Sequence, residues 1–187
     1  MNIFISGGCK NGKSFYAQHY AQHLAKKQKI GGLYYIATMK PVDEEDKERI
    51  VRHRSERNGL GFKTIEQYTD IEKILDKCEY NSSFLLDSLT ALLANEMFPA
   101  DGSVNEHAAE KISGGLLKVM DNTNNIVIVS DYIYGDGRLY DPLTEKYRKA
   151  LAEIDYGAAK KSDIVLEIVF TNVIIHKGKE LFGELYE

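Results

Sequence analysis

The sequence has only two cysteines, three prolines and no tryptophan among its 187 residues. Cys9 and Cys78 lie far apart without a CxxC pair, which argues against zinc ribbons and disulfide scaffolds. No apolar run approaches the roughly 18 residues of a membrane span, and the N-terminus lacks the features of a secretory signal. The formal net charge of −4 argues against a general binder of nucleic acid or membrane surfaces. We therefore expect a soluble, cytoplasmic protein.

The composition is that of a globular protein. Hydrophobic residues make up 43% of the chain and charged residues 28%, which excludes a disordered or collagen-like chain. A chain of this length can bury roughly 70% of its unfolded surface without a disulfide or zinc staple. We expect a single domain that covers residues 1–187.

Short apolar runs alternate with longer helical patterns along the chain. Apolar strands without alternation, separated by helices, are typical of a parallel sheet covered on both faces. The sequence thus predicts an α/β fold with a mostly parallel sheet and helices on both faces. We expect strands at 2–6, 33–37, 62–66, 83–87, 125–130 and 164–170, with a C-terminal segment at 173–176, and helices at 13–27, 43–58, 70–78, 89–98, 106–121 and 142–161.

The turn after the first expected strand fits G-x-x-x-x-G-K-[ST] without a mismatch. In such a loop, backbone N–H groups and the helix N-terminus bind phosphate oxygens. The lysine reaches the β- and γ-phosphates, and the hydroxyl can bind Mg²⁺. The position between a strand and a helix favours a nucleotide-binding, P-loop NTPase-like fold over a structural glycine turn. The eight residues are Gly7, Gly8, Cys9, Lys10, Asn11, Gly12, Lys13 and Ser14.

A second pattern agrees with the phosphate loop. The apolar strand F-L-L ends in Asp87, as does a Walker B element that holds Mg²⁺. The alternative is that this carboxylate only caps the helix that follows. Together with the phosphate loop, the pattern predicts a Mg²⁺ site at Ser14 and Asp87.

The expected helix at 43–58 has acidic residues in its first turn and basic residues toward its end. Arg49, His53 and Arg57 recur four residues apart and share one face of this helix. Two guanidinium groups around an imidazole suggest that this face of the helix binds anions. The alternative is a solvated helix whose bases pair with the preceding acids, and spacing alone does not decide between them.

Together these elements resemble the adenosylcobinamide kinase / adenosylcobinamide-phosphate guanylyltransferase family of cobalamin biosynthesis and salvage. The resemblance covers most of the chain in order. The signature R-I-x-x-H-R-x-x-R is far more specific than the phosphate loop. The matching motifs are I-S-G-G-x-x-x-G-K-S at 5–14, Y-I-A-T at 35–38, R-I-x-x-H-R-x-x-R at 49–57, F-x-T-x-E at 62–66 and L-L-D-S-L-T at 85–90.

The resemblance implies two reactions. The family phosphorylates the aminopropanol hydroxyl of adenosylcobinamide with ATP or GTP, and then transfers GMP from GTP through a guanylylated histidine. Carried over, it implies that His53 is the nucleophile, with Lys13 stabilising the leaving charge. It also implies a homotrimer with a cobinamide-like acceptor and no nucleic-acid partner. The implied nucleotide contacts outside the phosphate loop are Thr38, Arg54, Arg57, Glu66 and Asp87.

The second half of the chain departs from the family pattern. The family's Asn-Glu pair after the fifth strand is replaced by Asp131 and Tyr132, and the loop that follows is longer. A later Asn-Gln pair is replaced by Asp155 and Tyr156. These changes leave two other hypotheses open. One is a divergent kinase or nucleotidyltransferase that uses another small alcohol, and the other is a nucleotide-sensing protein without transfer activity.

Overall fold

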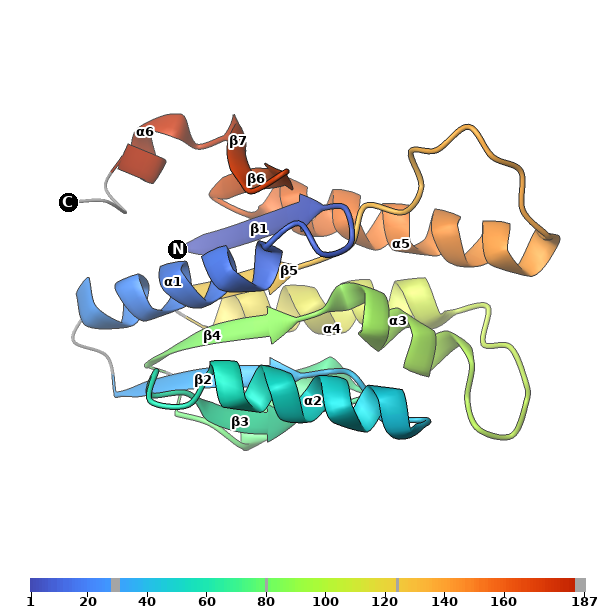
Figure 1. The fold of residues 1–187 in the computed structure, drawn as a ribbon, viewed down its shortest axis with the longest axis horizontal. Coiled ribbons are helices and arrows are strands. Elements are labelled where there is room, and N and C mark those ends of the chain that lie inside the picture. Colours follow the sequence, from blue (N-terminus) through green and yellow to red (C-terminus); the bar gives the residue numbers. More distant parts are fainter. Residues whose placement is uncertain (28–30, 80, 124, 184–187) are drawn as a thin grey trace.

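The computed structural model describes residues 1–27, 31–79, 81–123 and 125–183. They form an α/β structure, which confirms the fold class predicted from the sequence (Figure 1). Its elements are β1 (Asn2–Gly7), α1 (Lys13–Lys27), β2 (Gly32–Ala37), α2 (Glu44–Glu56), β3 (Lys63–Glu66), the 3₁₀ helix η1 (Ile71–Asp76), β4 (Ser82–Asp87), α3 (Leu89–Met97), α4 (Ala108–Asn122), β5 (Asn125–Val129), α5 (Pro142–Lys161), β6 (Ile164–Val169), β7 (Asn172–Lys177) and α6 (Lys179–Gly183).

The sheet has seven strands in the order β3-β2-β4-β5-β1-β6-β7. Strands β1 to β6 pair in parallel, and β7 runs antiparallel to β6 at the edge. Strand β5 lies between β1 and β4, so Val129 at its end pairs with Ile5 on one side and Asp87 on the other. The loops that follow β1, β4 and β5 therefore meet at one edge of the sheet, where ligands of open α/β sheets bind.

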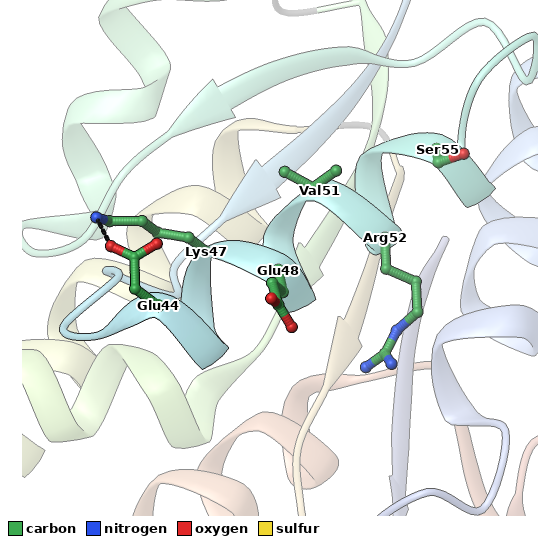
Figure 2. Close-up of a pocket in the computed structure, with 6 residues that line it drawn as sticks. All are labelled: Glu44, Lys47, Glu48, Val51, Arg52 and Ser55. Atoms are coloured by element: carbon green, nitrogen blue, oxygen red, sulfur yellow. Dashed lines mark hydrogen bonds and ion pairs between the residues drawn. The ribbon is translucent and has the colours of Figure 1, made fainter.

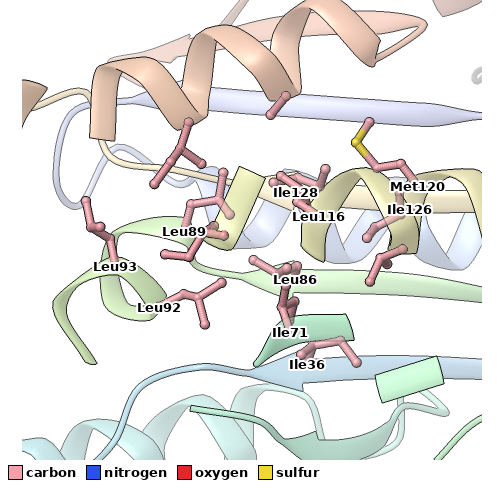
Figure 3. Close-up of a cluster of buried hydrophobic side chains, with 14 of the residues drawn as sticks. Ile36, Ile71, Leu86, Leu89, Leu92, Leu93, Leu116, Met120, Ile126 and Ile128 are labelled. Atoms are coloured by element: carbon pink, nitrogen blue, oxygen red, sulfur yellow. The ribbon is translucent and has the colours of Figure 1, made fainter. Parts of the chain in front are cut away.

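The sheet is covered on both faces, as its apolar strands predict. On one face, α1 packs its buried side chains Ala17, Tyr20 and Leu24 against the sheet. The opposite face is covered by α3, α4, α5 and η1, and Figure 3 shows the packing of their aliphatic side chains against strands β2, β4 and β5. Burial on two faces explains why the central strands are continuous apolar runs.

Two elements differ from the sequence expectation. The predicted helix at 70–78 is the shorter 3₁₀ helix η1, and it packs against α4 at Gly115. A Cβ atom on Gly115 would lie 2.7 Å from Glu72 Oε2, so this glycine permits a close approach and does not break α4. The predicted segment 173–176 is an antiparallel hairpin strand. Its two-residue turn, Phe170 and Thr171, has positive φ at both positions, as tight hairpins require.

Candidate functional site

The phosphate loop joins β1 to α1 at the carboxyl edge of the sheet. Gly7 has a φ of 150°, and a Cβ atom there would lie 2.4 Å from the carbonyl oxygen of Ile168. Gly12 also has a positive φ, of 88°. These glycines let the chain turn tightly enough for the first N–H groups of α1 to face the space above the loop.

Lys13 is the buried cation of the phosphate loop, with an exposed fraction of 6%. Its Nζ donates to the carbonyl oxygen of Gly8 at 2.6 Å and pairs with Asp131 at 2.7 Å. A buried ammonium group needs such partners because burial without them is costly. Asp131 is the second residue after β5, so the segment that follows the strand between β1 and β4 provides this carboxylate.

Ser14 and Asp87 meet directly. The Ser14 hydroxyl donates to Asp87 Oδ2 at 2.9 Å, and the Tyr35 hydroxyl donates to the same oxygen at 2.9 Å. Hydroxyl and carboxylate oxygens are the ligands that Mg²⁺ prefers. This pair is therefore where the described residues could hold Mg²⁺, although no group of three or more His, Cys, Asp or Glu among them could form an all-protein metal centre.

Helix α2 contacts the rest of the molecule near its C-terminal end. Asp43 caps its first turn by accepting a hydrogen bond from the Asp46 N–H at 2.8 Å. Within α2, none of the side chains that the structure describes is buried. The next residue, Arg57, is buried, and its guanidinium carbon lies 3.5 Å from the centre of the Tyr35 ring. This cation–π contact fixes the end of α2 over β2.

The other residues of the basic signature lie around this contact. His53 is half-buried, and the side chain of Arg49 lies outside the described part of the structure. Arg54 forms an ion pair with Glu66 at the end of β3. The Tyr68 hydroxyl also donates to Glu66, at 2.7 Å, and burial together with this carboxylate raises the pKa of Tyr68 to about 12.

A cleft of about 1150 Å³ runs along this edge of the sheet. It brings the phosphate loop and the basic signature together, because residues of both line it. The position of Thr38 differs from the expectation that it contacts the nucleotide. Its side chain is fully buried and does not line the cleft, because its hydroxyl is bonded to the backbone of Ser88. Gly7 and Gly8 are not part of the cleft lining, and the predicted residues that line it are Cys9, Lys10, Asn11, Gly12, Lys13, Ser14, His53, Arg54, Arg57, Glu66 and Asp87.

The outer side of α2 carries a second hollow, which Figure 2 shows. Its lining is Glu44, Lys47, Glu48, Val51, Arg52 and Ser55, with an ion pair of 2.5 Å between Glu44 and Lys47. Arg52 lines both this hollow and the main cleft. Val51 is 64% exposed here, so the outer face of α2 does not pack on the described core.

A buried carboxyl group outside the cleft lining lies near Asp131. Asp155 on α5 has an exposed fraction of 2%, and Tyr134 donates a hydrogen bond of 3.0 Å to its Oδ2. Burial raises the pKa of Asp155 to about 7. The hydroxyls of Ser130 and Tyr134 offset part of this rise, and the charge of Asp131 adds to it. The fold therefore contains a buried acidic group close to Asp131 whose pKa is raised to about 7.

Sequence reasoning missed three residues of this site. It did not assign Tyr35 as a partner of Asp87, Asp131 as the partner of Lys13, or Tyr68 as a partner of Glu66. A signal for Asp131 was present, since it follows an apolar strand whose end must lie at the same edge as the phosphate loop. The two tyrosines carried no such signal because aromatic residues in and beside strands are more often core.

The long loop at 131–142 lies mostly outside the cleft. Of its residues, Asp131 alone lines the cleft. Arg148 on α5 holds the rest by donating to the carbonyl oxygens of Ile133, Arg138 and Asp136 and to the Asp136 carboxylate. The loop is therefore anchored to α5 and does not fold over the phosphate loop.

Comparison with known proteins gives the same fold. A KaiC-like protein from the hyperthermophilic archaeon Pyrococcus horikoshii is 13% identical in sequence. The alignment covers 96% of this chain and 79% of that chain, with a TM-score of 0.56. At this identity the similarity establishes the P-loop NTPase fold alone. No curated protein sequence matches this chain. Among the helices of the described residues, none is both long and apolar enough to cross a membrane.

The family comparison is more specific. The sequence profile described as cobinamide kinase / cobinamide phosphate guanyltransferase matches residues 3–172. This range includes the phosphate loop, the basic signature and the altered loop after β5. It confirms the resemblance read from the motifs. The chain belongs to the cobinamide kinase / cobinamide phosphate guanyltransferase family, a family of nucleotide-using enzymes of the cobalamin pathway.

Proposed function

We propose that this protein phosphorylates the aminopropanol hydroxyl of adenosylcobinamide and then transfers GMP from GTP to the product through guanylylated His53. One observation carries the proposal, namely that the phosphate loop and His53 line the same cleft. A triphosphate held by the loop can therefore extend toward the imidazole without leaving the site. The volume of about 1150 Å³ exceeds that of a nucleotide and leaves room for the aminopropanol end of an acceptor.

The phosphoryl transfer step needs mainly positioning and charge neutralisation. The N–H groups at the start of α1 and the ammonium of Lys13 would bind the β- and γ-phosphates. Ser14 and Asp87 would hold Mg²⁺, which when bound neutralises phosphate charge. Tyr35 donates to Asp87 and so orients the carboxylate. In this step the acceptor oxygen bonds to the γ-phosphorus, and the nucleoside diphosphate leaves.

The guanylyl transfer step uses the basic signature of α2, which lines the same cleft. A neutral His53 imidazole would attack the α-phosphorus of GTP, and pyrophosphate would leave with its charge stabilised by Lys13. The acceptor phosphate oxygen then attacks the same phosphorus and releases the imidazole. Arg57 lies over Tyr35 beside this position, and Arg54 is paired with Glu66, so both guanidinium groups are oriented before the nucleotide binds.

The experiment is to incubate the protein with Mg²⁺ and GTP labelled at the α-phosphate. We expect covalent label that is lost in acid and kept in base, as a phosphorus–nitrogen bond requires. His53→Asn should abolish it. His19→Asn is the matched control, because His19 also lines the cleft and has no assigned role. Label that survives His53→Asn would refute the histidine assignment.

Transfer to the acceptor separates the remaining hypotheses. After free nucleotide is removed, adenosylcobinamide phosphate should take up the label from the protein. An enzyme that is labelled but transfers only to other alcohols or phosphates would be a divergent transferase. Tight GTP binding without label or turnover would indicate a nucleotide sensor. Light scattering of the purified protein tests the homotrimer that the family resemblance predicts.

A further inference from the structure

Three carboxylates line the cleft in the described part of the chain, and two of them already have partners that fix their roles. Asp87 accepts from Ser14 and Tyr35. Glu66 is paired with Arg54 and accepts from Tyr68. The third carboxylate, Asp131, pairs with Lys13 at 2.7 Å, and its side chain is 31% exposed to the cleft. Among the described residues, its charged partner is thus Lys13, the cation that must turn to the phosphates when a nucleotide binds.

The backbone around Asp131 is held from two sides. Its own N–H donates to the Thr90 hydroxyl at 2.9 Å. The N–H of Tyr132 donates to the carbonyl oxygen of Gly7 at 2.9 Å. Thr90 is itself held, because the Tyr147 hydroxyl donates to its carbonyl oxygen at 2.8 Å. The carboxylate is thus fixed beside the phosphate loop, between Lys13 at the start of α1 and Asp87 at the end of β4.

Binding of a triphosphate changes the surroundings of this carboxylate. Lys13 donates instead to the β- and γ-phosphate oxygens. Asp131 is then left next to the γ-phosphate without its cation, and two anions at short range repel one another. A hydroxyl placed between them removes this conflict by donating to the carboxylate and pointing its oxygen at phosphorus. That is the arrangement a general base needs.

We propose that Asp131 is the general base of the phosphoryl transfer step. This inference rests on the proposed function, because it needs an acceptor hydroxyl in the cleft. The hydroxyl oxygen forms a bond to the γ-phosphorus, and its proton passes to the Asp131 carboxylate. The bond between the γ-phosphorus and its bridging oxygen breaks, and the nucleoside diphosphate leaves with that electron pair. The proton is afterwards released to water.

The test compares wild type with Asp131→Asn, which keeps the shape of the side chain and removes its basicity. The first readout is ATP-dependent phosphorylation of adenosylcobinamide. We expect kcat to fall about 100-fold or more, the usual contribution of a positioned base. The second readout is ATP binding measured by calorimetry. Binding should be as tight or tighter, because an anion beside the γ-phosphate has been removed. A merely structural role would weaken binding and lower the melting temperature.

Asp76→Asn is the matched control, since Asp76 is exposed at the end of η1 and away from the cleft. It should leave both readouts as in wild type. A fall in kcat of less than threefold in Asp131→Asn would overturn the proposal while leaving the proposed function intact. So would a loss of kcat that is matched by weaker ATP binding.

A wild type that does not phosphorylate adenosylcobinamide would refute the proposed function. The role of Asp131 as general base would then be tested by the rate of intrinsic ATP hydrolysis, in which water is the acceptor. A fall of about 100-fold in hydrolysis by Asp131→Asn would support the base role with another acceptor. Equal hydrolysis, or no turnover by either protein, would overturn it.

Discussion

The Ser14 hydroxyl donates a hydrogen bond of 2.9 Å to Asp87, joining the start of α1 to the end of β4 across 73 residues of sequence. The parallel sheet makes this contact possible, because it brings the carboxyl ends of β1, β5 and β4 to one edge. The hydroxyl and the carboxylate are thus in place before any nucleotide or metal binds. Preorganisation of this kind lowers the cost of binding.

Replacing Asp87 by Asn should raise the Mg²⁺ concentration needed for half-maximal activity by about tenfold or more, because a neutral amide is a weaker ligand for a hard cation. Nucleotide binding without Mg²⁺ should change little. The measurement is a Mg²⁺ titration of phosphoryl transfer. Tyr35→Phe is the matched comparison, since it removes one hydrogen bond to Asp87 and keeps the carboxylate. Equal Mg²⁺ requirements in Asp87→Asn and wild type would contradict the metal assignment.

Replacing Arg57 by Ala should lower the free energy of unfolding by about 2 kcal/mol, because a desolvated cation–π contact and the packing of its stem are lost. Arg57 is 7% exposed and lies 3.5 Å from the centre of the Tyr35 ring. Urea denaturation measures the change. Arg52→Ala, an exposed residue of the same helix, should change stability by less than about 0.5 kcal/mol. If the two variants lose stability equally, the contact does not anchor α2.

The sequence predicted most of the fold because its strands are buried on both faces. Runs such as 125–130 could not be mistaken for amphipathic helices. The length of η1 was not predictable. Its isoleucines, Ile71 and Ile74, fit an α-helix as well as a 3₁₀ helix, and packing against Gly115 on α4 decides between them.

The pH dependence of stability should reveal Asp155. Its pKa is about 7 in the folded protein, above the ordinary 3.8 of the unfolded chain. Between these values the folded state holds a proton that the unfolded state has lost. The free energy of unfolding therefore falls as pH rises from about 4 to 7, and this contribution is level above pH 7.

Asp155→Asn lacks this titration and can still accept the hydrogen bond from Tyr134. We expect it to be more stable than wild type above pH 7, by up to about 4 kcal/mol at 1.4 kcal/mol per pKa unit. The gain should vanish near pH 4. Urea denaturation at both pH values measures it. A gain that is the same at both pH values would show that the carboxyl group titrates normally.

Arg148 should control the order of the loop at 131–142. It is 7% exposed and donates to two carboxylates and three carbonyl oxygens. Arg148→Met should lower the free energy of unfolding by about 3 kcal/mol, because it removes the hydrogen bonds and ion pairs that one buried guanidinium makes. Amide hydrogen exchange should rise in residues 133–140. Lys149→Met, at the exposed neighbouring position, should leave that exchange unchanged. Unchanged exchange in Arg148→Met would refute the anchoring role.

The candidate site was less predictable than the fold. The phosphate loop and Asp87 follow from short motifs whose spacing the chemistry imposes. Only the family resemblance predicted that the loop at 7–14 and the helix at 44–56 share one site. The spacing of Arg49, His53 and Arg57 does not predict it, because a basic helix exposed to solvent can have the same spacing. The burial of Thr38 was not predictable either. Its hydroxyl is bonded to the backbone of Ser88, a contact between the residues that follow β2 and β4, which no local pattern encodes.

The central claim is that His53 carries GMP, and peptide mapping of the labelled protein tests it most directly. Cleavage after glutamate releases residues 49–56, a peptide whose single histidine is His53. After reaction with Mg²⁺ and α-labelled GTP, the account predicts one labelled peptide, 49–56, whose label passes to adenosylcobinamide phosphate when that acceptor is added. Label on any other peptide, or label on 49–56 that the acceptor never removes, would contradict the account.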